Sequence, residues 1–427
     1  MTTAVRKEPS PLAVGPISWE KVMANEGGAG PFFLVFDTCT HARYYGDVHE
    51  VLALPQGSII RYEYKRYLFK ATAAAALDGL VNDPSKLPAD ALLMYGQKRG
   101  YRQGDPDSPG MLRWEDSVFI PTRSARIVAV ARERGADPES DVLHFHLETR
   151  GFVDPDSKWL EPMVRALEGA NSLPFGRRNE QYAWISLLPD SLRPHRGALV
   201  SDDQLPWSKV IDSLVTAPTQ FEKDVFWRVR QICRASHTAA PSEPLPLQDR
   251  KTNLRVHTSR WHRDYPLFET ERYEIFVQTY APGAHGQAVP GDATIAMTSR
   301  DDDQGLIKLS ANPLEIVPNE TSSQRFSIDT DAALESRYAG VRLETQVPGR
   351  ESPFPAGSIC TLTFAIRKRV YRLVLGVLFL VGAAIVGTSL TSPKITASLE
   401  KGGLAGLALL LGATGIWMLT KQFKIIK

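Results

Sequence analysis

Two pairs of residues in the first 150 positions have the types and spacing that catalysis or metal binding requires. Cys39 and His41 stand two residues apart, and a thiol beside an imidazole can form a thiolate nucleophile. His144 and His146 also stand two apart, so in a strand both imidazoles share one face and could hold a metal. No orienting carboxylate follows from the spacing, and no HExxH, GxSxG or P-loop motif accompanies the pairs. Polar strand ends explain both pairs more simply, so we expect no catalytic residue, cofactor or metal.

A second group of residues has the composition of a nucleic-acid or anion contact. Cationic side chains neutralise phosphates, and tyrosine rings between them can stack on bases. An amphipathic strand explains the first segment equally well, because Tyr62 and Tyr64 would then share one face. The candidate contacts are Arg61, Tyr62, Tyr64, Lys65, Arg66, Lys98, Arg99 and Arg102.

The composition sets broad limits on function. The chain has 427 residues, a formal net charge of +2 and three separated cysteines, Cys39, Cys233 and Cys360. The near-neutral charge gives no overall sign of nucleic-acid binding, and the cysteines indicate neither a disulfide framework nor a zinc site. Residues 1–16 lack the apolar segment of a secretory signal, so we expect a disordered tail there.

The elements that would position these residues fall in an α+β region, 17–237, which we expect to act as a sensor or partner-binding region. Runs rich in β-branched and aromatic residues, such as 32–37 and 142–153, predict a small curved sheet or barrel. Apolar residues at helical spacing over 207–214 and 220–236 predict helices that pack against it.

A second region follows a proline-rich linker, 238–250. Residues 251–367 contain about seven short runs of strand character separated by turns, a pattern typical of an antiparallel β-sandwich. The last run, 358–366, alternates between apolar and polar residues. We therefore expect a juxtamembrane β-sandwich domain.

The end of the chain holds two long runs without charge, 373–390 and 402–420. Each would form a helix of roughly 27 to 29 Å, close to the ~30 Å hydrocarbon thickness of a bilayer. A buried pair in a soluble core would need helices that are apolar on every face, which is uncommon. The sequence therefore predicts a two-helix transmembrane hairpin over 373–420, with a basic tail at 421–427.

Basic residues flank this hairpin and are scarce in its connecting loop, 391–401. By the positive-inside rule, both termini and the soluble domains should face the cytoplasm at the bacterial inner membrane. The same residues would form a collar that attracts anionic headgroups. This collar consists of Arg367, Lys368, Arg369, Arg372, Lys421, Lys424 and Lys427.

Small residues recur in both runs, whereas ionisable side chains do not occur there, which excludes a proton relay through the spans. Small residues let helix backbones approach closely. They could pack the two helices of one hairpin or join the hairpins of neighbouring chains. They are Gly376, Gly382, Ala383, Gly387, Gly402, Gly406, Gly412 and Gly415.

The order of these regions, rather than any motif, resembles the two-helix membrane effectors of prokaryotic antiviral systems, such as those paired with Argonaute, cyclic-oligonucleotide or CRISPR sensors. The resemblance implies soluble domains that bind a protein or nucleoprotein partner encoded nearby. It further implies homo-oligomeric hairpins that depolarise or permeabilise the membrane during abortive infection. No site residue is implied.

Two other functions remain open at this point. A tail-anchored adaptor would tether a partner to the membrane without perturbing it. An enzyme would use Cys39 with His41, or His144 with His146. A fall in membrane potential on triggering distinguishes the effector from the adaptor.

Overall fold

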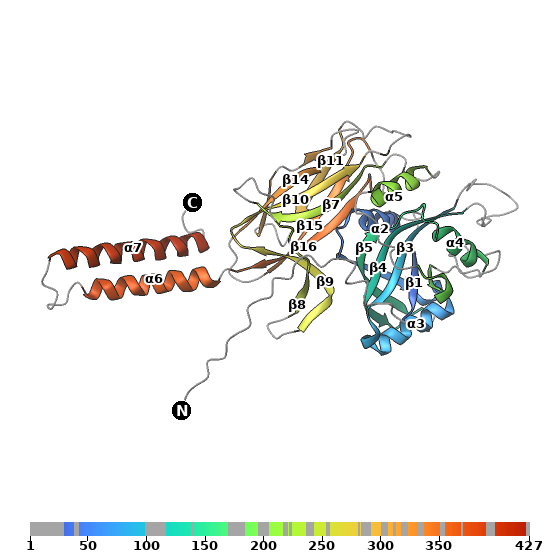
Figure 1. The fold of residues 1–427 in the computed structure, drawn as a ribbon, viewed down its shortest axis with the longest axis horizontal. Helices are drawn as coiled ribbons and strands as arrows, with labels where there is room; N and C mark the ends of the chain where they lie inside the picture. Colours follow the sequence, from blue (N-terminus) through green and yellow to red (C-terminus); the bar gives the residue numbers. More distant parts are fainter. Residues whose placement is uncertain are drawn as a thin grey trace, which may run out of the picture.

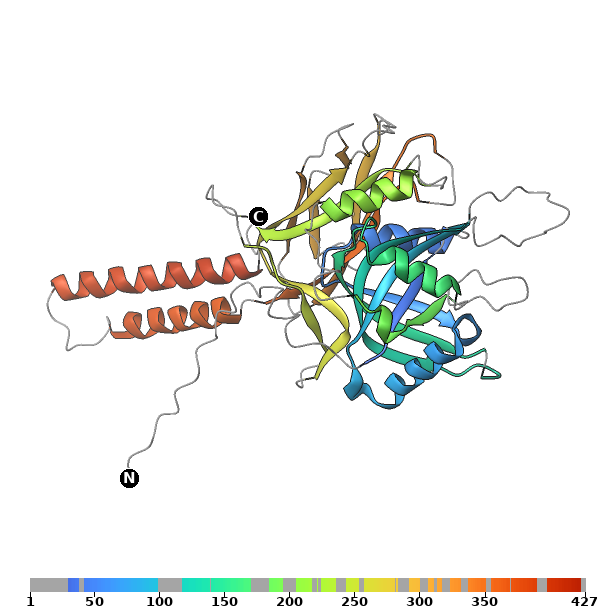
Figure 2. The ribbon, with the colours of Figure 1, turned by 45° about the vertical axis from the view of Figure 1, so that its right-hand side comes forward.

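The computed structural model is mostly β-structure, with three sheets and six α-helices in the residues that it describes. Figures 1 and 2 show a β-rich body from which two C-terminal helices extend. The described residues are 30–37, 42–98, 117–138, 140–169, 184–194, 205–216, 221, 224–235, 243–252, 257–280, 282, 292–299, 306–310, 313–316, 323–331, 337–350, 355–368, 370–389 and 398–423.

The first sheet forms the N-terminal half of the body. Its strands are β1 (Phe32–Asp37), β2 (Ile59–Lys65), β3 (Ala89–Lys98), β4 (Ser117–Glu133), β5 (Val142–Phe152) and β6 (Ile185–Leu188). They lie in the order β2-β5-β4-β3-β1-β6, with β1 parallel to β3 and the other neighbours antiparallel. All six residues of β1 are buried, as expected of an apolar strand covered on both faces.

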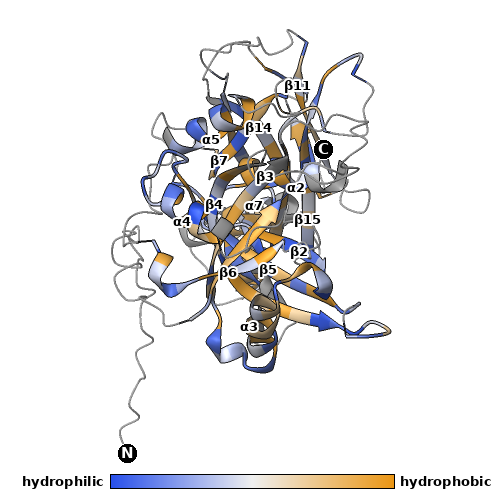
Figure 3. Ribbon diagram, turned by 90° about the vertical axis from the view of Figure 1, so that its right-hand side faces the viewer, coloured by the Kyte–Doolittle hydropathy of each residue, from blue (hydrophilic) through white to orange (hydrophobic). Residues whose placement is uncertain are grey.

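This sheet is strongly curved. Three strands separate β2 from β1, yet the Tyr62 hydroxyl on β2 donates a hydrogen bond of 2.6 Å to Asp37 on β1. The helices of this half are α2 (Ala42–Ala53), α3 (Ala71–Asn82), α4 (Leu160–Gly169) and α5 (Leu205–Thr216). The helix predicted over 207–214 is confirmed as part of α5. Figure 3 shows hydrophobic residues along the central strands and hydrophilic ones on α4 and α5.

Two further sheets share one apolar core in the other half of the body. The four-stranded sheet has the order β12-β14-β10-β7, and the six-stranded sheet has the order β13-β11-β15-β16-β9-β8. Unlike in the antiparallel sandwich that was predicted, β16 pairs with β9 in parallel. The strands are β7 (Phe226–Arg234), β8 (Gln248–Thr252), β9 (His257–Phe268), β10 (Arg272–Tyr280), β11 (Thr294–Ser299), β12 (Ile307–Ser310), β13 (Leu314–Glu315), β14 (Ser323–Thr330), β15 (Arg337–Gln346) and β16 (Ile359–Arg367).

The helix predicted over 220–236 is wrong, because β7 occupies that segment. Its apolar residues fit a helical spacing, but Val225, Trp227 and Val229 also fit the two-residue spacing of a strand. Pairing with β10 and a hydrogen bond of 2.8 Å from Trp227 Nε1 to Thr345 Oγ1 select the strand. Thus β7 belongs to a sandwich sheet, and β8 begins inside the segment predicted as linker.

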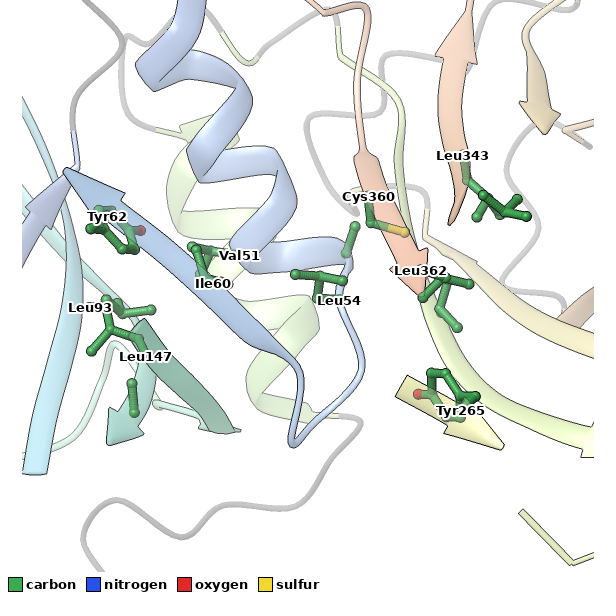
Figure 4. Packing of buried hydrophobic residues seen from close by; sticks show 14 of the residues in the cluster. Val51, Leu54, Ile60, Tyr62, Leu93, Leu147, Tyr265, Leu343, Cys360 and Leu362 are labelled. Carbon is green, nitrogen blue, oxygen red and sulfur yellow. The ribbon is translucent and has the colours of Figure 1, made fainter. Parts of the chain in front are cut away.

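Helix α2, which the sequence patterns did not reveal, lies between the two halves. Its Val51, and Leu54 directly after the helix, belong to a core that continues from the first sheet into the sandwich. Figure 4 shows the Leu54 side chain between two groups of apolar residues. One group is Ile60, Tyr62, Leu93 and Leu147, and the other is Tyr265, Leu343, Cys360 and Leu362.

The C-terminal helices are α6 (Val370–Ser389) and α7 (Ser398–Phe423), which lie side by side and extend away from the body (Figure 1). The predicted transmembrane hairpin over 373–420, and with it the predicted fold class, is wrong. In the part of the chain that the structure describes, no helix has both the length and the apolar character needed to cross a membrane. As formed, the helices also include Arg372, Glu400, Lys401 and Lys421.

Candidate functional site

The two helices of the hairpin pack closely where glycines meet. A Cβ atom added at Gly415 would lie 2.8 Å from the Gly376 carbonyl oxygen and 3.0 Å from a side-chain carbon of Leu380. A Cβ atom added at Gly412 would lie 3.8 Å from the Ala383 Cβ atom. Small residues at these positions therefore let α6 and α7 approach each other.

Other small residues of the hairpin have open space around them. Within the described residues, a Cβ atom added at Gly387, Gly403 or Gly406 would meet no atom within 4 Å. These positions therefore do not serve packing inside the hairpin. The surroundings of Gly402 lie outside the described residues.

Large apolar side chains of both helices are exposed. Leu409 is 75% exposed and Leu410 is 65% exposed, far more than is usual for leucine in a folded protein. Exposed apolar side chains gathered on one pair of helices indicate a site of interaction with another molecule. Its exposed members are Val374, Leu375, Val377, Leu378, Val381, Ile385, Leu407, Leu409, Leu410, Ile416 and Trp417, here called the hairpin surface.

Only part of the predicted basic collar can be placed. Arg367 ends β16, and its Nη2 atom donates to Gln248 Oε1 at 2.5 Å. Lys368 follows it directly, so only Lys368 and Arg369 separate β16 from α6. The surroundings of the other collar residues, Arg369, Arg372, Lys421, Lys424 and Lys427, lie outside the described residues.

The structure separates the predicted nucleic-acid contacts into two groups. Tyr62 and Tyr64 are buried and stack on Phe145, so their rings are part of the core rather than a platform for bases. Arg61 and Lys65 point to the exposed side of β2. Arg66 forms an ion pair of 2.6 Å with Asp78. The side chain of Lys98, and Arg99 and Arg102, lie outside the described residues.

The histidines on β5 have protein partners. His144 Nε2 lies 3.0 Å from Glu133 Oε2, and its Nδ1 lies 3.1 Å from Arg61 Nη2. His146 is buried with its ring edge-on to His262, at a centroid distance of 6.0 Å. No group of three or more metal-binding side chains occurs among the described residues. Cys39 and His41 lie outside them.

Sequence reasoning missed a buried carboxyl group at the end of β1. Asp37 Oδ2 accepts the Tyr62 hydrogen bond, whereas Oδ1 has no partner among the described residues. Burial, together with the nearby Asp47 carboxylate, raises the pKa of Asp37 well above its usual range. An acidic residue that ends an apolar run, here FFLVFD, is the signal that could have drawn attention to it.

A second polar cluster, here called the clamp, also went unnoticed. It consists of Tyr45 and His49 on α2, Asp224 before β7, and Arg350 in the turn between β15 and β16. Asp224 accepts hydrogen bonds from Tyr45 and Arg350, and His49 Nε2 lies 2.8 Å from its Oδ2. Tyr45 and Asp224 are 179 positions apart, so spacing along the chain gave no signal.

Comparisons with known proteins do not identify the chain. No family model matches it, and neither does any curated protein. One solved structure that matches is described as "AvmM Catalyzes Macrocyclization in Alchivemycin A Biosynthesis". The match is 15% identical and covers 24% of this chain and 82% of that one, with a TM-score of 0.17. This score is too low to support any argument about fold or activity.

Proposed function

We propose that the chain is a non-catalytic assembly protein whose body binds a protein or nucleoprotein partner and whose hairpin joins copies of the chain into a homo-oligomer. The hairpin surface carries this proposal, because exposed apolar side chains on both helices gain free energy when they leave water. Burying them against other apolar side chains would stabilise the assembled form.

A second copy is the occupant that fits this surface best. The segments 373–390 and 402–420 contain no charge that could orient a polar partner, so an equally apolar surface is the complementary one. Gly387, Gly403 and Gly406 have open space that lets a neighbouring helix come close. Two hairpins packed together would form a bundle of four helices.

The mass of the full chain in solution, measured by light scattering after gel filtration, tests this proposal. We expect the wild type to form oligomers and Leu409→Glu/Leu410→Glu to remain a single chain. Tyr67→Glu is the matched control, because Tyr67 is a large residue that is 47% exposed on the body. A wild type that stays monomeric, or that binds phosphatidylglycerol vesicles without forming oligomers in their absence, would contradict self-association.

The proposal extends to a role as an effector or an adaptor in prokaryotic antiviral defence. As an effector, the assembled protein would cause a fall in the potential of the bacterial cytoplasmic membrane; as an adaptor, it would only gather the partner. Membrane potential in cells that express the chain with its neighbouring genes distinguishes the two. Depolarisation that Leu409→Glu/Leu410→Glu abolishes supports the effector, whereas an unchanged potential with copurification of a partner supports the adaptor.

A further inference from the structure

One face of α7 carries residues that alternate between small and large. Residues separated by three or four positions share one face of a helix. This face holds Gly406, Leu410, Ala413 and Trp417, here called the α7 stripe. Leu410, Ala413 and Trp417 are exposed, and Trp417 is 58% exposed. A Cβ atom added at Gly406 would meet no described atom within 4 Å, so the whole stripe is open to another molecule.

The alternation makes the α7 stripe complementary to its own reverse. When two α7 helices run in opposite directions and are centred between Leu410 and Ala413, Gly406 of each copy lies level with Trp417 of the other. A large side chain then meets a small residue at every level, which fills the space between the helices. When the helices run in the same direction, Trp417 meets Trp417 and Gly406 meets Gly406, so one level is crowded and another is left open. The α7 stripe therefore fits an antiparallel pair.

The charges at the ends of the hairpin favour the same direction. Because Gly415 lies against Gly376, the end of α7 lies beside the start of α6, at the foot of the hairpin next to the body (Figure 1). No acidic residue occurs in 367–372 or 421–423, and the basic residues at the foot include Arg367, Lys368, Arg372 and Lys421. A parallel pair would bring two basic feet together, where like charges repel. In an antiparallel pair the feet are separated by about the length of α6, roughly 30 Å, whereas salt screens charges beyond about 8 Å.

The short connection between β16 and α6 adds a steric reason. Only Lys368 and Arg369 stand between these two elements, so the body must stay close to the foot of the hairpin. A folded body of about 360 residues is roughly 50 Å across, whereas packed helices lie about 8–10 Å apart. Parallel hairpins would press two bodies together at one end, whereas antiparallel hairpins place them at opposite ends of the bundle. Figures 1 and 2 show that the hairpin extends clear of the body, so its length is available to a second hairpin.

We propose that the α7 stripe is the contact through which two copies of the chain associate, with the two α7 helices antiparallel and Trp417 of each copy packed over Gly406 of the other. This inference rests on the assembly function proposed above and adds the orientation of the second copy. The same residues serve on both sides, so the contact has two-fold symmetry. Such a contact closes on itself, so the assembly that it forms is a dimer with one body at each end.

Disulfide cross-linking of the full chain tests the orientation. The variants Gly406→Cys and Trp417→Cys are oxidised separately and as a mixture, and the linked dimer is detected on a non-reducing gel. A disulfide needs Cβ atoms about 4 Å apart, whereas the eleven residues between the two positions span roughly 16 Å of helix. We therefore expect a linked dimer in the mixture and none with either variant alone. The wild type, and a mixture of Gly406→Cys with Tyr67→Cys on the body, are controls that should give no link.

Light scattering of the same samples separates this inference from the assembly function. Oligomers in which Gly406→Cys links to itself would show a parallel pair and overturn the inference, while the assembly function stands. Oligomers without a link in the mixture would place the contact away from the α7 stripe and overturn it as well. A wild type that remains a single chain contradicts the assembly function itself.

Trp417→Ala provides a measurement that needs no cross-link. Ile416→Ala is the matched control, because Ile416 is 54% exposed on the same turn of α7 but lies outside the α7 stripe. We expect Trp417→Ala to raise the concentration at which half of the chains associate by about tenfold or more, as truncation of a central aromatic residue does, and Ile416→Ala to raise it by less than about threefold. Equal effects of the two variants would overturn the inference.

Discussion

Glu50 shows how one side chain at the junction of the two halves makes stability depend on pH. It lies on α2, near Asp47 of the same helix and Arg342 of β15. Burial raises the pKa of Glu50 from 4.5 to about 7, and the Asp47 carboxylate adds to the effect. The folded protein therefore holds this proton more tightly than the unfolded chain does.

Replacing Glu50 by Gln should remove this pH dependence. Because the pKa of Glu50 is raised in the folded protein, its bound proton contributes fully to stability below pH 4.5. This contribution is lost as the pH rises to about 7. We expect the stability of the wild type, relative to Glu50→Gln, to fall by about 2–3 kcal/mol over this range. Urea unfolding at several pH values measures it. Glu161→Gln, at an exposed site, should show no such trend, and parallel curves for wild type and Glu50→Gln would contradict the assignment.

Tyr62 should stabilise the fold through its hydroxyl group. Tyr62→Phe keeps the ring in the core but removes the hydrogen bond to the buried Asp37 carboxyl group. We expect the free energy of unfolding to fall by about 1–3 kcal/mol, because a buried polar atom loses its partner. Urea unfolding gives the value, and Tyr67→Phe, at an exposed tyrosine, is the control. Equal stability of Tyr62→Phe and wild type would show that the hydrogen bond contributes nothing.

At the scale of single residues, the sequence predicts exposed side chains better than buried polar ones. The outward side of β2, with Arg61 and Lys65, follows from simple alternation. The clamp does not, because Tyr45 and Asp224 meet only after β1, α2 and β7 have been arranged in space. A polar cluster whose residues come from distant segments has no characteristic spacing in the sequence, so a motif search does not detect it.

At the scale of elements, Gly415 should be essential for the α6–α7 contact. In Gly415→Leu the side chain would collide with the Gly376 carbonyl oxygen, so the helices must separate. Gly406→Leu meets open space among the described residues and should leave the pair intact while weakening self-association. Hydrogen exchange of the α6 and α7 amides tests this, with faster exchange expected for Gly415→Leu alone. Equal exchange in both variants would contradict the packing described.

Elements with a clear alternation were predicted well, and those with mixed patterns were not. The strand predicted over 358–366 is confirmed, because Cys360, Leu362 and Phe364 point inward without exception. In β7 the apolar residues suit both a helix and a strand, and only the neighbouring strand β10 decides. The sequence of α2 shows no clear apolar stripe, because polar residues such as His49 are buried together with apolar ones such as Val51. Helical periodicity therefore did not predict this helix.

At the scale of the whole molecule, the shared core should make the two halves unfold together. Leu54 directly follows α2 and lies between them, and its side chain is buried (Figure 4). We expect one unfolding transition for the wild type, seen alike by tryptophan fluorescence and circular dichroism. Leu54→Ala should lower stability by about 2–5 kcal/mol and separate the two signals. Two transitions in the wild type would show that the halves are independent.

The attachment of the hairpin through β16 has a mechanical consequence. β16 lies inside its sheet, with β15 on one side and β9 on the other, and it passes almost directly into α6. A force that pulls on the hairpin therefore acts along β16 and shears two ladders of hydrogen bonds at the same moment. Strands that are sheared resist more than strands that are peeled from an edge, so tension on the hairpin should reach the body before the connection gives way.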